Sequence, residues 1–320
     1  MQPRDCDATL ARGASVVSVT PTPTRTHAAS RSQLTFGGIV PSAATVQGDT
    51  VLASVLAVEM HSDGAVLPLL VLSEASGVLG WDLPTGLSVT DDAGRDYAVE
   101  QVAGSSGLGA LAATAWIEPA PPPEARTLAL TLDGLTRTVA SRRGGLERPL
   151  TPEPLSLELD LVPERTAAEV PEEPELPVGE RPAGRAPARA RTSFAGLVPI
   201  GQARLDPDGA VCLWALERYR DRSVLTVAAL SDEPVRLEAM APGSGQADLW
   251  DDRGNRYGAV PVHGASQAGW MEASLEVTPA IDPAARVLAV RLSRLPATAE
   301  GRADPPLAGP FTFGVTLPPT

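Results

Sequence analysis

Lysine is absent from this chain of 320 residues, and histidine and cysteine are scarce, with three and two residues respectively. Acidic side chains outnumber the basic ones, so that the formal net charge is −13. Such a charge repels a phosphate backbone, and no basic cluster interleaved with aromatic residues is present in the sequence. We therefore expect no binding to nucleic acid.

Long apolar runs are also missing. The longest, at 51–58 and 65–72, have the length of a strand, whereas a membrane-spanning helix needs about 20 apolar residues. The first residues, Met1 to Asp7, lack the apolar region of a secretory signal. Cys6 and Cys212 are far apart, and we expect no disulfide between them. These observations predict no membrane insertion and a cytoplasmic location.

An internal repeat organises the chain. The pattern Asp-Asp-x-Gly-x-x-Tyr occurs at 91–97 and again at 251–257. Asp-x-Gly between two β-prone runs is typical of a hairpin, because aspartate bonds to its own backbone and glycine adopts a positive φ. Matching blocks flank both copies in the same order: 36–41 with 194–199, and 155–161 with 311–317. The repeat therefore predicts two copies of one all-β domain.

The predicted organisation is an extended lead-in (1–32), domain 1 (33–163), a linker rich in Pro, Glu and Arg (164–190), and domain 2 (191–320). The linker is acidic in its first half and basic in its second, with almost no large apolar side chain. We interpret it as a flexible, solvated spacer. A charge-guided contact with a partner, or with the chain itself, stays open as the alternative.

Each copy contains about eight short strand-like segments and no sustained helical stripe, a pattern typical of a Greek-key sandwich. In the first copy we predict strands at 34–40, 51–60, 66–72, 87–90, 95–102, 111–117, 127–132 and 155–161. In the second copy we predict them at 193–198, 211–219, 224–230, 247–250, 257–262, 270–277, 287–292 and 311–317.

Three motifs carry a resemblance to a known class of domain. They are Asp-Asp-x-Gly-x-x-Tyr, the run Ala285-Arg286-x-Leu288-Ala289, and the closing Gly-Pro-Phe-Thr-Phe at 309–313. In these motifs the chain resembles uncharacterised immunoglobulin-like β-sandwich domains of bacterial proteins, present as a tandem duplication. The resemblance implies a fold, two immunoglobulin-like sandwiches joined by the flexible linker, and it implies no catalytic residues.

The paired aspartates Asp91, Asp92, Asp251 and Asp252 are the candidates for a metal site, since carboxylate oxygens bind calcium. Neither stretch supplies the alternating ligands and terminal glutamate of the known calcium loop. We therefore interpret them as turn residues, with a cation as the alternative.

Reactive side chains do not recur in the repeat. His27, His61 and His263 occupy non-equivalent positions, and no closely spaced Cys/His pair suggests zinc. The related segments Gly104-x-Ser106-x-x-Gly109 and Gly264-x-Ser266-x-x-Gly269 lack the spacing of a nucleophile elbow, so we interpret them as hairpin loops. We predict no catalytic residues and no cofactor.

Two further pairs of charged residues are shared by the copies: Glu59 with Glu217, and Arg126 with Arg286. We interpret these side chains as paired or solvated. The shared Tyr97 and Tyr257 favour a structural role at the sandwich edge, with ligand stacking as the alternative.

Together these features predict a non-enzymatic interaction or structural protein whose partner is another protein. The alternative is a ligand-binding module for a glycan or small molecule, for which Trp270, Ser266 and Tyr257 are the candidate residues.

Overall fold

The computed structural model describes part of the chain from residue 36 to residue 319. The described residues are 36–42, 44–75, 77–107, 109–141, 144–161, 167–175, 189, 191–207, 209–231, 236–237, 247–267, 270–293, 297–298, 307 and 309–319. The predicted lead-in and much of the linker lie outside them. Among the described residues no helix is long and apolar enough to cross a membrane.

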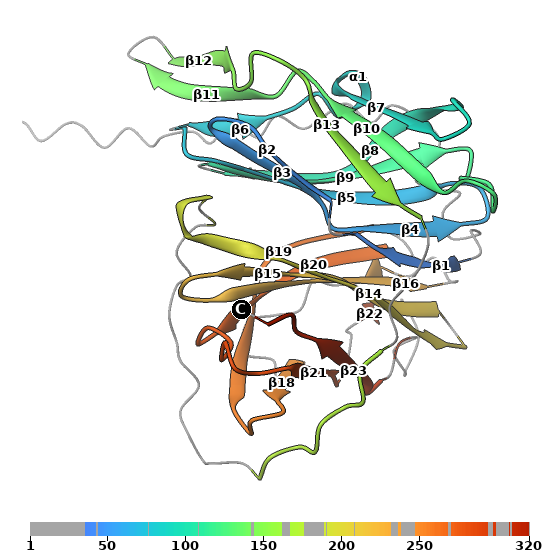
Figure 1. Ribbon diagram of the computed structural model, residues 1–320, viewed down its shortest axis with the longest axis vertical. Coiled ribbons are helices and arrows are strands. Elements are labelled where there is room, and N and C mark those ends of the chain that lie inside the picture. Colours follow the sequence, from blue (N-terminus) through green and yellow to red (C-terminus); the bar gives the residue numbers. More distant parts are fainter. Residues whose placement is uncertain are drawn as a thin grey trace, which may run out of the picture.

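Domain 1 is built almost entirely of strands (Figure 1). Its elements are β1 (Phe36–Pro41), β2 (Thr45–Gln47), β3 (Val51–Val55), β4 (Ala57–His61), β5 (Ala65–Ser73), β6 (Val78–Gly80), α1 (Leu83–Gly86), β7 (Leu87–Asp91), β8 (Asp96–Gly107), β9 (Ala110–Glu118), β10 (Thr127–Leu132), β11 (Thr136–Ser141), β12 (Gly144–Pro149) and β13 (Leu155–Asp160). Hydrogen bonds join the main strands in the order β1-β4-β5-β9-β8-β7-β10-β13, and β12-β11-β6 form a small separate sheet.

Domain 2 follows the same plan. After a short 3-10 helix (Arg191–Ser193) come β14 (Phe194–Asp206), β15 (Gly209–Tyr219), β16 (Ser223–Ser231), β17 (Arg236–Leu237), β18 (Ala247–Asp251), β19 (Arg256–Gln267), β20 (Trp270–Thr278), β21 (Val287–Leu292), β22 (Ala297–Thr298) and β23 (Phe311–Thr316). The main order is β14-β15-β16-β20-β19-β18-β21-β23, and β17 pairs with β22. Strands at corresponding places in the two halves therefore have corresponding neighbours. The predicted all-β class is confirmed.

A long, bent strand turns each sheet into two layers. In domain 2, the first residues of β19 pair with β18, whereas Gly258 to Gln267 pair with β20. Strands β14, β15, β16, β20 and β19 thus form a larger layer, and β18, β21 and β23 form a smaller layer that folds over it. Strand β14 also contacts β23, at the opposite edge of the sheet: Gln202 Nε2 donates to the Gly314 carbonyl oxygen at 2.7 Å. The result is a sandwich-like near-barrel. In domain 1, β8 bends between β7 and β9 in the same way.

Apolar side chains fill the space between the two layers of each domain. In domain 2 this inner core includes Leu225, Leu249, Leu288 and Phe313. Strand β13 alternates strictly, with Leu157 and Leu159 buried and their neighbours exposed. Such alternation is expected of a strand that has one face on the core and one face in water.

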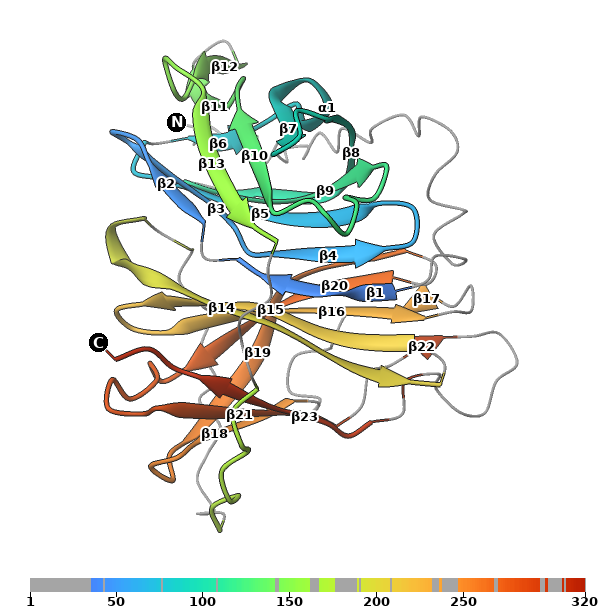
Figure 2. The same cartoon turned by 45° about the vertical axis from the view of Figure 1, so that its right-hand side comes forward.

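The outer faces of the two larger layers bury each other. A third apolar cluster lies between the domains, formed by Leu52, Leu56, Ala57, Val66, Leu70, Leu72 and Trp116 of domain 1 and by Ala210, Cys212, Trp214, Ala215, Tyr219, Val224, Ala228 and Trp270 of domain 2. We call it the interdomain core. Figures 1 and 2 show the two larger layers stacked, with β1 at the boundary, where it lies against β14.

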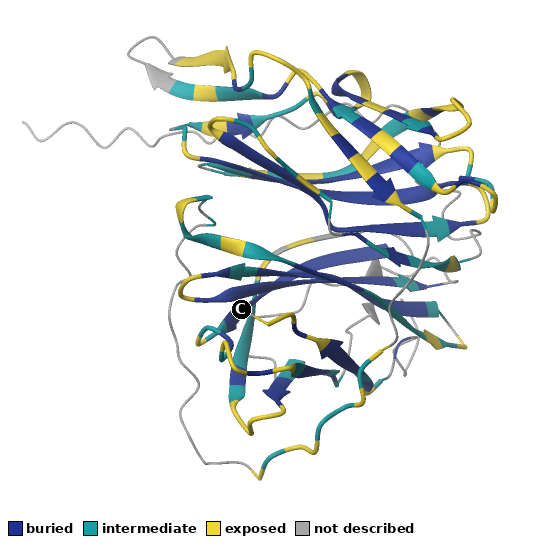
Figure 3. Cartoon of the chain, viewed as in Figure 1, coloured by how far each residue is buried: buried dark blue, intermediate teal, exposed yellow. Residues whose placement is uncertain are grey.

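Burial on both sides explains the composition of these strands. All nine residues of β5 are buried, and β15 and β16 are buried along most of their length (Figure 3). Strands covered on both faces carry continuous apolar runs in place of alternation. The domains are therefore in direct contact.

Most predicted strands are present, and the differences have local causes. Strand β14 continues to Asp206, beyond the predicted end at 198, because a bulge between Pro199 and Gln202 accommodates turn-like residues, with Gly201 at a φ of 54°. The β11–β12 hairpin was not predicted from the sequence. Residues 104–107 and 264–267 lie in β8 and β19, so the prediction that they form loops is wrong.

The substitution Ala228→Arg tests the interdomain core. Ala228 is fully buried between the domains, directly across from Glu272 on β20. An arginine there would force a long side chain into a closely packed core and would require its charge to be desolvated. We expect it to lower the free energy of unfolding by roughly 3 kcal/mol or more. Tryptophan emission should shift to longer wavelength, because Trp116, Trp214 and Trp270 lie in this core.

The matched control is Ala129→Arg, at an exposed position of β10. It should change the free energy of unfolding by less than about 0.5 kcal/mol. Equal stability and equal emission of the two variants in urea denaturation would contradict the packing described above.

Candidate functional site

Asp251 holds the β18–β19 hairpin together. Its Oδ1 accepts the backbone N–H groups of Arg253 and Asn255, each at 2.9 Å, and its Oδ2 accepts the Tyr257 hydroxyl at 2.6 Å. Gly254, at a φ of 83°, supplies the positive φ of the turn. Burial opposes ionisation of Asp251, but hydrogen bonds from Tyr257 and Asn255 outweigh it, and the pKa of the carboxyl lies below its usual range.

Domain 1 repeats this arrangement. Asp91 Oδ1 accepts the backbone N–H groups of Ala93 and Arg95 at 3.0 and 2.8 Å, and Oδ2 accepts the Tyr97 hydroxyl at 3.0 Å. The backbone bond from Arg95 is the main cause of a lowered pKa for Asp91. Burial, followed by the bond to Asp91, raises the pKa of Tyr97 to about 12.

The second aspartate of each pair accepts a hydrogen bond from the backbone just before the next strand of the smaller layer, β10 or β21. Asp92 Oδ1 accepts the Arg126 N–H at 3.2 Å, and Asp252 Oδ1 accepts the Arg286 N–H at 3.0 Å. In the part of the chain that the structure describes, no three His, Cys, Asp or Glu side chains form a possible metal site. The contacts of all four aspartates agree with the turn interpretation of the repeated motif.

The three candidate ligand-binding residues do not form a site. Tyr257 is 7% exposed, and its hydroxyl also accepts the Asp282 N–H at 3.0 Å. Trp270 is 4% exposed and lies in the interdomain core. Ser266 lies in β19, where its backbone pairs with Met271. Neither aromatic ring offers an open face to a ligand.

Buried polar side chains connect the two domains. Glu59 of domain 1 is fully buried and accepts Trp214 Nε1–H of domain 2 at 2.9 Å, while its other oxygen lies 2.8 Å from His61 Nε2. Domain 2 also contributes a buried carboxyl group, because Glu272 Oε2 accepts a hydrogen bond from Thr114 Oγ1 of domain 1 at 2.6 Å. These bonds are made across the interdomain core, in surroundings where an unpaired polar group is costly.

The second shared glutamate is engaged as well. Glu217 is fully buried, and it accepts Arg189 Nη2–H at 2.8 Å and the Tyr219 hydroxyl at 2.7 Å. Arg189 also donates to Ser274 Oγ at 3.1 Å. The shared glutamates were interpreted from the sequence as paired or solvated, and the structure shows them paired.

Burial changes the pKa values of the side chains in the interdomain core. Burial raises the pKa of Glu272 above its usual range, although the bond from Thr114 opposes this shift. Burial, and then the charge of Glu59, raise the pKa of the Cys212 thiol well above its usual value. A thiolate nucleophile is therefore disfavoured at Cys212.

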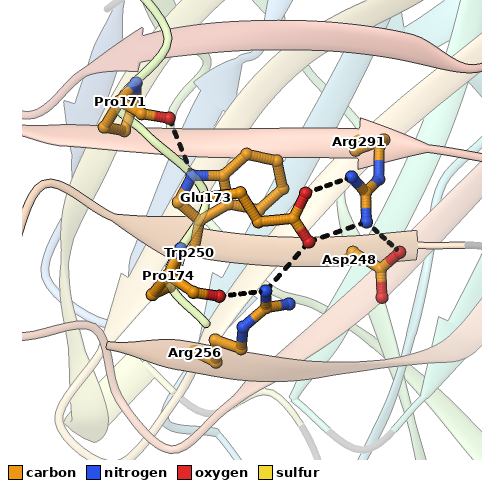
Figure 4. A network of polar contacts seen from close by, with 7 residues as sticks. All are labelled: Pro171, Glu173, Pro174, Asp248, Trp250, Arg256 and Arg291. Carbon is orange, nitrogen blue, oxygen red and sulfur yellow. Dashed lines mark hydrogen bonds and ion pairs between the residues drawn. The ribbon is translucent and has the colours of Figure 1, made fainter. Parts of the chain in front are cut away.

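A segment of the predicted linker lies on the smaller layer of domain 2 (Figure 4). Residues 167–175 run in extended form over β18, β21 and β23. Trp250 Nε1 donates to the Pro171 carbonyl oxygen at 3.0 Å, and Arg256 Nη2 donates to the Pro174 carbonyl oxygen. We call residues 167–175 the docked segment. It is the intramolecular contact that the charge pattern of the linker left open.

Glu173 is the charged anchor of the docked segment. Arg291 donates to both carboxylate oxygens of Glu173, and Arg256 Nη2 donates to Oε1 at 2.8 Å. The bond from Arg291, followed by that from Arg256, lowers the pKa of Glu173. Arg291 is itself positioned by Asp248 at 3.1 Å and lies over the Trp250 ring, 5.3 Å from its centroid. We call Trp250, Arg256 and Arg291 the segment-binding surface.

Comparisons with known proteins add little. The chain matches no protein-family model and no curated protein. One similar solved structure is a conserved domain protein from Bacillus anthracis, with 11% identity over 77% of this chain and 74% of that chain, at a TM-score of 0.25. Another is the N-terminal periplasmic domain of ScsB from Proteus mirabilis, with 12% identity over 86% and 97%, at a TM-score of 0.21. Scores this low support no inference about fold or function.

Tyr257→Phe tests the hairpin. We expect it to lower the free energy of unfolding at pH 7 by roughly 1–2 kcal/mol, the cost of a lost buried hydrogen bond. Because the bond stabilises ionised Asp251, its contribution is complete above the unfolded pKa of about 3.9 and is lost as the pH falls through the lower folded value. Urea denaturation between pH 2 and 7 should show a loss that shrinks in acid, and an equal loss at every pH would contradict the assignment.

Glu272→Gln tests the buried carboxyl. Burial raises the folded pKa of Glu272, so the protonated carboxyl is the form that the folded state favours. Its contribution to the free energy of unfolding is fully present below the unfolded pKa of about 4.3 and is lost as the pH rises through the folded value. We expect the variant, which keeps an acceptor for Thr114, to be more stable than the wild type at pH 7 and equal to it below about pH 4. The control is Glu158→Gln, at an exposed position of β13. Clear destabilisation at pH 7 would contradict this assignment.

Proposed function

We propose that this chain is a non-catalytic protein-interaction or structural protein, formed by two duplicated immunoglobulin-like sandwich domains that act as one rigid unit. The strand order supports this fold. In domain 2, β15, β16, β20 and β19 lie in the order of strands A, B, E and D of an immunoglobulin sheet, and β18, β21 and β23 in that of C, F and G. β14 is then an additional edge strand.

The equivalence of the two halves supports the duplication. The same neighbours recur in domain 1, where β7, β10 and β13 take the places of β18, β21 and β23. Both copies place the Asp-Asp-x-Gly-x-x-Tyr motif in the same hairpin, with the same aspartate–tyrosine bond. Local hydrogen bonds of this kind explain why the two domains share the residues of this motif without any catalytic role.

One observation carries the proposed function: both outer faces of domain 2 contact polypeptide. Its larger layer binds domain 1 through the interdomain core, and its smaller layer binds the docked segment. Apolar packing dominates the first contact, and donor–acceptor pairs dominate the second. The sheet faces of this protein therefore have the chemistry of protein-binding surfaces.

The alternative, a glycan or small-molecule module, finds no support in the described residues. Trp116, Trp214, Trp250 and Trp270 are buried, so that stacking platforms for sugar rings are scarce. Tyr257 is committed to its hairpin.

Affinity capture from a native lysate, with the whole chain as bait, tests the proposal. We expect a stoichiometric protein partner and no thermal stabilisation by panels of glycans and small molecules. The variant Ala228→Arg serves as a matched bait in which the rigid unit is disrupted. A ligand at 100 times its dissociation constant stabilises a protein by about 2.7 kcal/mol. A shift of that size with a glycan, and no captured protein, would overturn the proposal.

A further inference from the structure

We propose that the segment-binding surface of domain 2 is a recognition site for acidic, proline-containing extended peptides, and that the docked segment is its intramolecular ligand. A partner protein would bind by presenting a segment of the same chemistry. This inference rests on the proposed function and names the class of partner.

The bonds to the docked segment are those of peptide recognition. Its sequence contains Pro171-Glu172-Glu173-Pro174, a Pro-x-x-Pro spacing that favours the polyproline II conformation. Proline lacks an N–H group, so the backbone of such a segment is recognised through its carbonyl oxygens. Trp250 and Arg256 donate to the carbonyl oxygens of the two prolines. Aromatic surfaces with such donors are a recurring mode of binding proline-rich peptides.

Charge selects an acidic residue between the prolines. The guanidinium groups of Arg256 and Arg291 both bind the Glu173 carboxylate, and charge-assisted bonds of this kind are the stronger class. Asp248 and the Trp250 ring hold Arg291 in place. The site is therefore arranged by residues of domain 2 that do not belong to the ligand.

The shape of β23 completes the site. At Gly314 a β-carbon would lie 2.2 Å from the Ala168 carbonyl oxygen, so the backbone of the docked segment approaches β23 where no side chain is present. A residue larger than glycine at this position would displace the segment.

Domain 1 lacks this surface although it has the same strands. At positions equivalent to Asp248, Trp250, Arg256, Arg291 and Gly314 it carries Ser88, Thr90, Asp96, Thr131 and Glu158. None of these side chains offers the indole donor or a guanidinium group, and Asp96 and Glu158 repel an acidic peptide. The site is thus a specific feature of domain 2, beyond what the shared fold requires.

Exchange of the docked segment is physically accessible. The Glu173 side chain is 37% exposed, and ion pairs near the surface are weakened by salt. A tethered ligand competes at an effective concentration of about millimolar. An external peptide should therefore bind weakly to the wild type and more tightly once the docked segment is released.

The test uses the whole chain and a fluorescent synthetic peptide with the sequence of residues 167–175. Glu173→Arg releases the docked segment by repulsion from Arg256 and Arg291, and the milder Glu173→Gln is the second release variant. By fluorescence anisotropy, we expect the peptide to bind the released chain about tenfold or more tightly than the wild type, and to lose affinity as salt is raised. Adding Arg291→Gln to the released chain should abolish this gain.

Matched peptides test the specificity. Glu172 is exposed, so a peptide carrying Glu172→Gln should bind like the parent, whereas Glu173→Gln in the peptide should bind about tenfold more weakly. Equal binding of both peptides, or no gain in either released chain with a wild-type melting profile, would overturn the inference. A captured partner whose binding is unaffected by Arg291→Gln would overturn it too, while leaving the proposed function intact.

Discussion

The mutual burial of two sheet faces is the constraint on which the rest of this structure depends. Each larger layer is covered on its inner side by its own smaller layer and on its outer side by the other domain. Fully burying a large apolar side chain contributes about 1.5–3 kcal/mol, so an interface containing Leu70, Trp116 and Trp214 makes separation of the domains unfavourable. The two domains consequently behave as one body, whose outer surfaces are the loops and the two smaller layers, and the smaller layer of domain 2 carries the docked segment.

Polar groups inside this apolar contact fix its geometry. Glu59 meets Trp214, and Thr114 meets Glu272, each pair joining the two domains. Arg191 adds bonds to the carbonyl oxygens of Gly48 and Asp49. A rotated or shifted arrangement would leave buried carboxylates without partners, at a cost larger than any apolar contact it could gain. Apolar area thus drives the contact, and these polar pairs select its register.

The sequence was sufficient for features that depend on local interactions. Hairpins at Asp91 and Asp251 follow from the turn chemistry of Asp-x-Gly, and β13 follows from strict alternation. Contacts between distant segments were harder to predict. The continuous apolar runs of β5 and β16 are explained by burial on both faces, but such runs do not show which surface covers a strand. The docked segment could not be predicted from the repeat, because Trp250, Arg256 and Arg291 are positions at which the two halves of the chain differ.

Part of the linker binds domain 2 and therefore does more than separate the two domains. A simple spacer would make no specific contacts, whereas here the backbone at Ala168 packs on Gly314 and two arginines bind the Glu173 carboxylate. The contact between the domains nevertheless determines which sheet faces a partner can reach. Small-angle X-ray scattering of the wild-type chain tests it most directly. We predict the distance distribution of a single compact particle at every salt concentration. A distribution with two separated maxima, typical of independent lobes on a tether, would contradict it.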